Sequence, residues 1–406
     1  MLRRLAALFC MTTAFAGGYG LGPAPSDSDV TGSVQIAIAE PPPQVSVHYK
    51  FTPSVVVKVR PPVTLPPTAT ADAPQKPAIV PNEREKVAEP VRPFRPELPP
   101  AMPLTRSRTQ LVSFASAPFP YDGVVPRTQS PFLNFKDSGR VGHKTFSGRI
   151  YWADSTYSDS RVLLHVPKGF DTHRPGVMVL FFHGHGATLE RDVLARQRVP
   201  EQITESGLNA VLVAPQFAVD ARDSSAGKLW TPQGLRKFLE ETADQLTQIH
   251  GDPSARRMFA SMPVVIVGYS GGYVPTAAAL SSGVATNRIR GAVLLDGLYG
   301  EIEKFARWIE QTKNGFFLSA YTNSTRRGNG ELMRILSERN VKYATALNGR
   351  VRPGSVTFVE AEFGHRDYVT RAWAENPISD LLRRMTGIAP RARIDLSASL
   401  DLRLAR

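Results

Sequence analysis

Residues 264–279 read VVIVGYSGGYVPTAAA, and the architecture of the chain can be worked out from them. The β-branched run Val264–Val267 is typical of a strand buried in a parallel sheet. A glycine-rich turn with a central serine, Ser270, follows at once, and the next residues, to Leu280, are small, apolar and compatible with a helix. Strand, tight turn and helix form the context in which a G-x-S-x-G pattern marks an exposed nucleophilic serine. The alternative is a glycine-rich turn that only packs a helix against a strand.

Apolar strands alternate with helical segments on both sides of this stretch. Gly176–Phe182 is a continuous apolar run, as in a strand buried on both faces. Strands that alternate with helices of this length predict βαβ crossovers, and hence an α/β fold with a mostly parallel sheet and helices on both faces. We expect strands at 146–152 and 161–167, forming an antiparallel start, and then at 176–182, 210–214, 264–267, 290–295, 316–321 and 356–361. The expected helices are 192–206, 231–250, 273–280, 301–312, 331–340 and 367–385.

The composition excludes several classes of site. The net charge is +13 and the pI is about 9.9, with the basic residues spread along the chain. We expect a solvated basic surface with some attraction to anionic surfaces, and no nucleic-acid partner, because neither a basic helix nor zinc-finger spacing occurs. Cys10 is the single cysteine, so the rest of the chain has no disulfide, thiolate nucleophile or cysteine-based zinc site.

The first 16 residues have the pattern of a secretory signal peptide. Two arginines precede the apolar run Leu5–Ala16, which ends in an A-x-A cleavage motif at residues 14–16. This pattern predicts export to the periplasm or the medium. The alternative is an uncleaved membrane anchor, since Leu5–Gly22 carries no charge and approaches the length that spans a bilayer.

Residues 17–135 form the next region. Residues 23–135 hold 23 of the chain's 34 prolines, including runs that fit neither a helix nor a central strand. We therefore expect a disordered, semi-extended tether between the leader and a folded domain at 136–388. The tether would either hold that domain away from the cell envelope or associate with the envelope itself. Residues 389–406 are expected to be a polar tail.

Three residues with complementary chemistry each follow a predicted strand. Ligands bind outside the carboxyl ends of strands in an open α/β sheet, and Ser270, Asp296 and His365 all arise there, in that order. An imidazole takes the serine proton, and a buried carboxylate fixes the imidazole tautomer. Asp296 could instead cap the following helix, and Asp220 and Asp223 are weaker candidates for the carboxylate.

These motifs together resemble the α/β-hydrolase family, and in particular secreted bacterial serine hydrolases of the esterase type. The resemblance covers roughly residues 145–387 and rests on GYSGG at 268–272, HGHG at 183–186, Asp296, and Gly364-His365. It implies Ser270 as nucleophile and His365 as general base. It also implies an oxyanion hole formed by the backbone amides of His185 and Gly271. In that family the acid commonly follows the seventh strand, where residues 321–324 offer no carboxylate; Asp296 follows the sixth strand, a placement that some members use.

The pair His183 and His185 also invites a metal interpretation. A zinc site like that of the metallo-β-lactamases would continue with aspartate and histidine, but Ala187 and Thr188 follow here. We expect neither a metal nor another cofactor.

Substrate contacts are expected from aromatic residues near the strand ends. The loop 215–230 is the longest near the site and would form a partial lid, whereas 296–315 has room for one helix and no cap domain. The expected substrate-binding residues are Phe217, Trp230, Tyr273 and Tyr299, for each of which core packing is an equal alternative.

Three functions remain open at this point. The first is an exported carboxylic-ester hydrolase that acts through an acyl-serine on a small-molecule or polymer-linked ester. The second is an amidase or peptidase with the same Ser-Asp-His triad. The third is a non-catalytic cell-envelope-binding protein that retains the fold.

Overall fold

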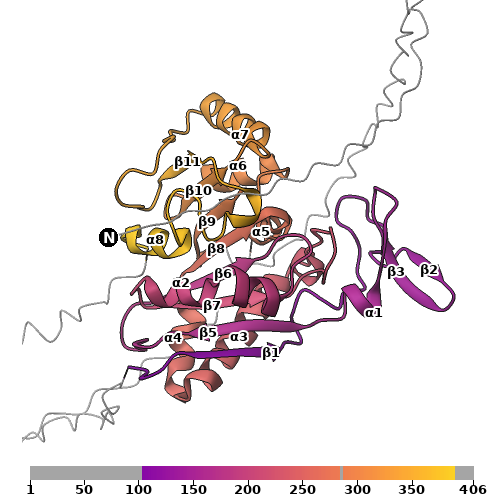
Figure 1. The fold of residues 1–406 in the computed structure, drawn as a ribbon, viewed down its shortest axis with the longest axis horizontal. Coiled ribbons are helices and arrows are strands. Elements are labelled where there is room, and N and C mark those ends of the chain that lie inside the picture. The colour runs from indigo at the N-terminus through magenta and orange to yellow at the C-terminus, as the bar shows by residue number, and fades with distance from the viewer. Residues whose placement is uncertain (1–102, 284–286, 389–406) are drawn as a thin grey trace, which may run out of the picture. The chain divides into compact units, whose positions relative to one another are not determined.

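A computed structural model describes residues 103–283 and 287–388 (Figure 1). The expected leader at 1–16, the tether as far as residue 102 and the tail at 389–406 lie outside the described residues. Within the described ranges, no helix has both the length and the apolar character needed to cross a membrane.

An eight-stranded sheet forms the centre of the fold, in the order β1-β5-β7-β6-β8-β9-β10-β11. The strands from β7 onward in this order pair in parallel, whereas β5 is antiparallel to both of its neighbours. This confirms the predicted α/β fold with a mostly parallel sheet. The strands are β1 (Arg108–Ser113), β5 (Arg161–Val166), β6 (Val177–Phe182), β7 (Ala210–Pro215), β8 (Val264–Tyr269), β9 (Ile289–Leu295), β10 (Phe316–Tyr321) and β11 (Val356–Glu360).

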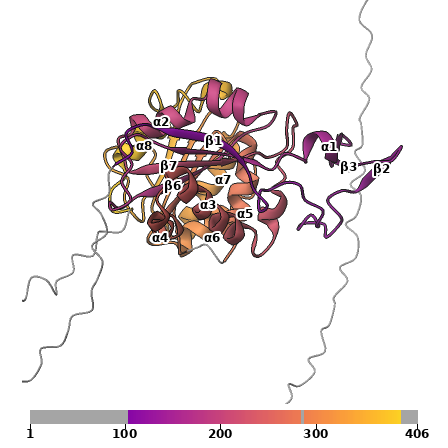
Figure 2. The same ribbon diagram turned by 90° about the horizontal axis from the view of Figure 1, so that it is seen from below.

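Helices cover both faces of this sheet, as predicted (Figure 2). Because successive strand side chains point to opposite faces, Met178 and Leu180 enter one apolar core, and Val177 and Val179 enter the other. The first core lies under α3 (Gly234–His250), α4 (Arg256–Ser261), α5 (Tyr273–Ser281), α6 (Ile302–Gln311) and α7 (Arg326–Glu338). The second lies under a π-helix (Leu189–Arg196), α2 (Val199–Glu205) and α8 (Pro377–Arg384).

Three predicted helices are wrong in extent. The one expected at 331–340 begins five residues earlier, at Arg326, and prolines limit the other two. The single helix expected at 192–206 is divided at Arg198, whose φ is +51°, just before Pro200 in the first turn of α2. The helix expected at 367–385 is helical only from Pro377, which follows Asn376 at a φ of +52°. Proline lacks an N–H to donate, so it is tolerated in the first turn of a helix and not in the interior of a continuous one, and a new helix begins at Pro377 and one residue before Pro200.

The boundary of the tether at residue 135 is also wrong over 103–135. Strand β1 forms the antiparallel edge of the main sheet, and Phe114, Phe119 and Phe132 are buried in the first core. Prolines lie on both sides of β1 and not within it, and an edge strand tolerates such neighbours. Proline density therefore concealed an apolar segment that belongs to the folded body.

The strand expected at 146–152 is shorter and lies in another sheet. Strand β4 (Ile150–Trp152) pairs with β3 (Arg140–Lys144), which pairs with β2 (Phe135–Asp137), and none of the three joins the main sheet. The short helix α1 (Ala153–Thr156) follows β4. The antiparallel pair predicted between 146–152 and 161–167 is therefore wrong, and β5 pairs in antiparallel fashion with β1 instead.

Candidate active site

Ser270 stands in a strained turn between β8 and α5. Its φ is +51°, a region that residues other than glycine seldom adopt, and a 3-10 turn (Ser270–Gly272) connects it to α5. The flanking glycines make this turn possible. A Cβ on Gly268 would collide with the Thr276 hydroxyl, and one on Gly272 would collide with the Phe182 carbonyl. The G-x-S-x-G pattern therefore reflects close packing of β8, α5 and β6.

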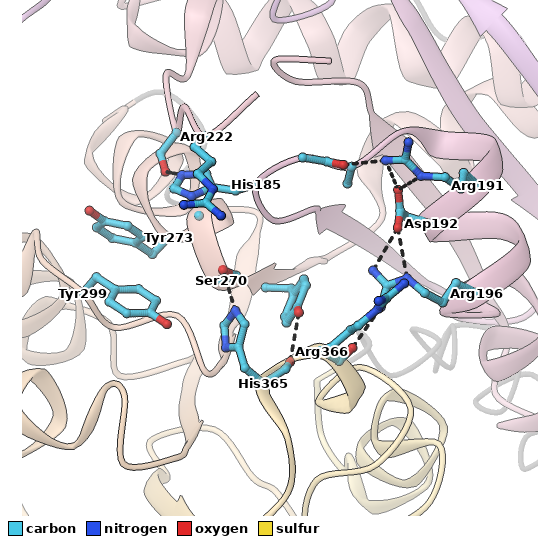
Figure 3. A pocket seen from close by; sticks show the side chains of 15 residues that line it. His185, Arg191, Asp192, Arg196, Arg222, Ser270, Tyr273, Tyr299, His365 and Arg366 are labelled. Atoms are coloured by element: carbon cyan, nitrogen blue, oxygen red, sulfur yellow. Dashed lines mark hydrogen bonds and ion pairs between the residues drawn. The ribbon is translucent and has the colours of Figure 1, made fainter. Parts of the chain in front are cut away.

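Ser270, His365 and Asp296 form one hydrogen-bonded series. The Ser270 Oγ lies 2.9 Å from His365 Nε2, and His365 Nδ1 lies 2.5 Å from Asp296 Oδ2. Their positions follow from the sheet, because the parallel strands β8, β9 and β11 end at the same edge. Figure 3 shows the contact between Ser270 and His365. With the Nδ1–H donating to the carboxylate, Nε2 is left to accept the serine proton.

Asp296 is buried and surrounded by donors from the segment after β10. Oδ1 accepts from the Thr322 N–H at 3.0 Å and the Thr325 hydroxyl at 2.6 Å. Oδ2 accepts from the Thr322 and Ser324 hydroxyls, both at 2.9 Å. Burial alone would raise the pKa of Asp296, but the hydrogen bonds from His365, Thr325 and Thr322 outweigh it and hold the pKa below its usual value. Asp296 is therefore a carboxylate at neutral pH.

The two weaker candidates for the acid are engaged elsewhere. Asp220 pairs with Arg191 at 2.8 Å, and Asp223 accepts from the Tyr157 hydroxyl at 2.9 Å. Among the contacts of the described residues, neither reaches His365.

Tyr269 orients His365 from the other side. The two rings stack with centroids 5.3 Å apart, and the Tyr269 hydroxyl donates to the His365 carbonyl at 2.9 Å. Burial raises the pKa of Tyr269 to about 12, which keeps the phenol protonated as a donor. Sequence reasoning missed this residue, and its place directly before Ser270 was the available signal.

The loop after β6 passes directly over Ser270. His183 is buried, and burial lowers its pKa to about 4, so its ring is neutral. Its Nδ1 lies 2.8 Å from the Gly184 carbonyl, and its Nε2 accepts from the Phe217 N–H at 2.9 Å. A Cβ on Gly184 would lie 2.8 Å from the Ser270 Cβ, so only glycine allows this approach. His183 thus ties the loop to the end of β7.

The same loop brings His185 to Gly271, the residue after the serine. The His185 ring covers Gly271 so closely that an added Cβ would lie 2.5 Å from its Cδ2, and His185 Nε2 lies 2.6 Å from the Ser224 Oγ. Across the described part of the chain, no hydrogen bond uses the His185 backbone N–H. The residues described also contain no group of three or more histidine, cysteine or acidic residues placed to hold a metal.

A cavity of about 790 Å³ opens at Ser270. Tyr273 and Tyr299 line it, as predicted, and Trp230 lines a neighbouring cavity of about 500 Å³ that shares Ser224 and Tyr273 with it. Phe217 was wrongly predicted to line the site. It is 4% exposed and packs against Phe182 with ring centroids 5.3 Å apart, because the bond from its N–H to His183 draws it into the core.

The cavity wall also includes residues that no sequence motif singled out. They are Arg191, Arg196, Arg222 and Arg366, of which Arg222 belongs, with Ser224, to the loop expected as a partial lid.

Comparison with known proteins gives remote similarities. No family model and no curated protein matches the sequence. An S-formylglutathione hydrolase from Agrobacterium tumefaciens aligns with 62% of this chain and 98% of its own, at 13% identity and a TM-score of 0.37. A feruloyl esterase module from Clostridium thermocellum covers 68% of this chain and 99% of its own, at 13% identity and a TM-score of 0.36. An IroE-like serine hydrolase from Shewanella oneidensis covers 55% and 74%, at 12% identity and a TM-score of 0.35.

Proposed function

We propose that this chain, whose fold is that of the α/β hydrolases, is a serine hydrolase that cleaves carboxylic esters. The observation that carries the proposal is the series Ser270–His365–Asp296, joined at 2.9 and 2.5 Å at the wall of an open cavity. The strained φ of Ser270 supports it, because such strain persists where the surroundings hold a functional side chain in place.

The first half of the reaction forms an acyl-serine. Ser270 Oγ attacks the acyl carbon while its proton passes to His365 Nε2, and the Asp296 carboxylate stabilises the imidazolium. The backbone N–H groups of His185 and Gly271 donate to the oxyanion, as a loop after the third strand and the residue after the nucleophile do in this fold. His365 then gives the proton to the leaving alkoxide, and the C–O bond breaks.

The second half consumes one water. His365 takes a proton from the water as it attacks the acyl carbon, the bond to Ser270 Oγ breaks, and the proton returns to that oxygen. The products are a carboxylic acid and an alcohol. An amide would follow the same path, but its amine leaves only with efficient protonation by His365, so matched ester and amide substrates distinguish the two activities.

Active-site labelling of the full chain tests the proposal. A fluorophosphonate probe should label the wild type on Ser270, located by peptide mass spectrometry, and Ser270→Ala and His365→Ala should remove the label. Ser337→Ala, an exposed helical serine on α7, is the matched control and should be labelled normally. Labelling on Ser224, which also contacts a histidine, would assign the nucleophile elsewhere. A folded wild type that resists the probe would favour the envelope-binding alternative.

Export is a second part of the proposal, and it rests on residues 1–16. When the full chain is expressed in a bacterial host, the mature protein should begin at Gly17 and occur in the periplasm or medium. An intact N-terminus in the membrane fraction would favour the uncleaved anchor, and a cytoplasmic product would contradict export.

A further inference from the structure

The cavity at Ser270 carries an excess of positive charge. The guanidinium groups of Arg191, Arg196, Arg222 and Arg366 line it, and Asp192 is the one carboxylate among its described lining residues. Figure 3 shows Arg222 beside His185 on one side of Ser270, and the other three arginines on the opposite side.

Two of these arginines have their charge offset. Arg191 pairs with Asp192 at 2.7 Å and with Asp220 at 2.8 Å. Arg196 pairs with Asp192 at 3.0 Å and donates to the Arg366 carbonyl at 2.9 Å. These contacts join the π-helix to the segment that carries His365, so a structural role accounts for both side chains.

Arg222 and Arg366 are different. Both are exposed at the cavity, and over the described residues neither guanidinium takes part in a hydrogen bond or an ion pair. Arg366 directly follows His365. Burial lowers the pKa of the neighbouring His185 ring; the charge of Asp223 opposes this shift, and the charge of Arg222, which lies close to the ring, adds to it. Two unpaired cations therefore stand on either side of the nucleophile.

A basic surface alone would also place arginines in the open, since the chain has a net charge of +13. Arginines in a cavity differ from arginines on an open surface, because a cleft lined by one sign of charge strengthens the local electric field and raises the local concentration of oppositely charged ligands. Guanidinium groups also match the geometry of carboxylate and phosphate oxygens.

We propose that this cavity selects esters that carry an anionic group, a carboxylate or a phosphate, a few bonds from the scissile bond, and that the charges of Arg222 and Arg366 attract that group. The inference rests on the proposed function, since it names the substrate class of the same site.

Matched substrates test it on the full chain. 4-Acetoxybenzoate carries a carboxylate, 4-acetoxyphenyl phosphate carries a phosphate, and methyl 4-acetoxybenzoate is neutral. All three release acetate and differ in the charge of the leaving phenol. Dividing kcat/KM for each ester by its rate constant for hydrolysis by hydroxide corrects for intrinsic reactivity, and the ratio of the anionic to the neutral ester then measures the preference for an anion. The wild type should prefer one of the anionic esters, and the larger preference identifies the anion.

Arginine variants then assign the preference to residues. Arg222→Gln or Arg366→Gln should lower the ratio of anionic to neutral kcat/KM about tenfold, as expected for a charged hydrogen bond at a partly exposed site. Arg257→Gln is the matched control. Arg257 is exposed on α4, which precedes β8 and so lies at the opposite edge of the sheet. An equal fall in all three variants would indicate an effect of net charge and overturn the assignment.

A binding measurement separates this inference from the proposed function. Calorimetric titration of Ser270→Ala with benzoate or inorganic phosphate should show one site, weakened by Arg222→Gln or Arg366→Gln in the same background. Absence of binding, or equal hydrolysis of anionic and neutral esters by a wild type that the fluorophosphonate labels, would overturn the anion site alone. A wild type without labelling would refute the hydrolase, and the titration would then decide the anion site by itself.

Discussion

Replacement of Asp296 by asparagine tests the triad through hydrogen-bond chemistry. Five donors face the carboxylate: the Thr322 N–H, the hydroxyls of Thr322, Ser324 and Thr325, and His365 Nδ1. Asparagine has one acceptor oxygen, and the Thr322 backbone N–H cannot reorient, so we expect that oxygen to take the Oδ1 position. The amide NH₂ then points at His365, which must accept at Nδ1 and carry its proton on Nε2.

The cost follows from that tautomer. With Nε2 protonated, His365 cannot take the Ser270 proton, and a change of this kind lowers kcat about 10⁴-fold, or about 5 kcal/mol of transition-state stabilisation. The assay is kcat/KM for 4-nitrophenyl acetate, with circular dichroism to confirm the fold. Asp220→Asn is the matched control, since Asp220 pairs with Arg191 and should cost far less. Activity within tenfold of the wild type in Asp296→Asn, or an equal loss in Asp220→Asn, would refute the reasoning.

Two further predictions concern stability and packing. Burial lowers the pKa of His165 and of His183 to about 4. An unfolded histidine titrates near 6.5, so the unfolded chain takes up protons on these rings before the folded chain does. The free energy of unfolding is therefore highest above pH 6.5 and falls as the pH drops to 4, by on the order of 3 kcal/mol for each ring. Urea unfolding at pH 7.5 and 4.5 measures the loss, and an unchanged midpoint would contradict it. Gly184→Ala should lower kcat by displacing Ser270, whereas Gly330→Ala, with open space at its Cβ, should leave activity intact.

The strands of the sheet could be predicted from sequence because burial on both faces leaves a plain apolar pattern. Val177–Phe182 is buried throughout, and its predicted bounds differ from the observed ones by a single residue. Strand β1, in contrast, was not predicted. Its exposed face gives a weak pattern, and the surrounding prolines led to the prediction of a tether.

The meeting of Ser270, Asp296 and His365 could be predicted because each follows a strand, and a parallel sheet brings strand ends together. The sequence could not specify which way side chains turn after the strand. Phe217 lies next to the expected pocket along the chain, but its N–H is tied to His183 and its ring enters the core. Arg222 lies in a loop and Arg366 in the 3-10 turn His365–Asp367, and no motif assigns either a role, so only the folded chain shows that both reach the cavity at Ser270.

The Asp296 carboxylate follows β9, whereas most of its hydrogen-bond donors follow β10. Asp296 leaves β9 with a φ of +43°, and its N–H donates to the Ala320 carbonyl at 2.8 Å, which extends the β9–β10 pairing by one residue. The carboxylate is thereby placed across the end of β10, against the segment from which the α/β-hydrolase resemblance expects the acid. That segment supplies Thr322, Ser324 and Thr325 as donors instead. The absence of a carboxylate at 321–324 and the presence of one at 296 are therefore two halves of one arrangement, in which β9 brings the charge and β10 stabilises it.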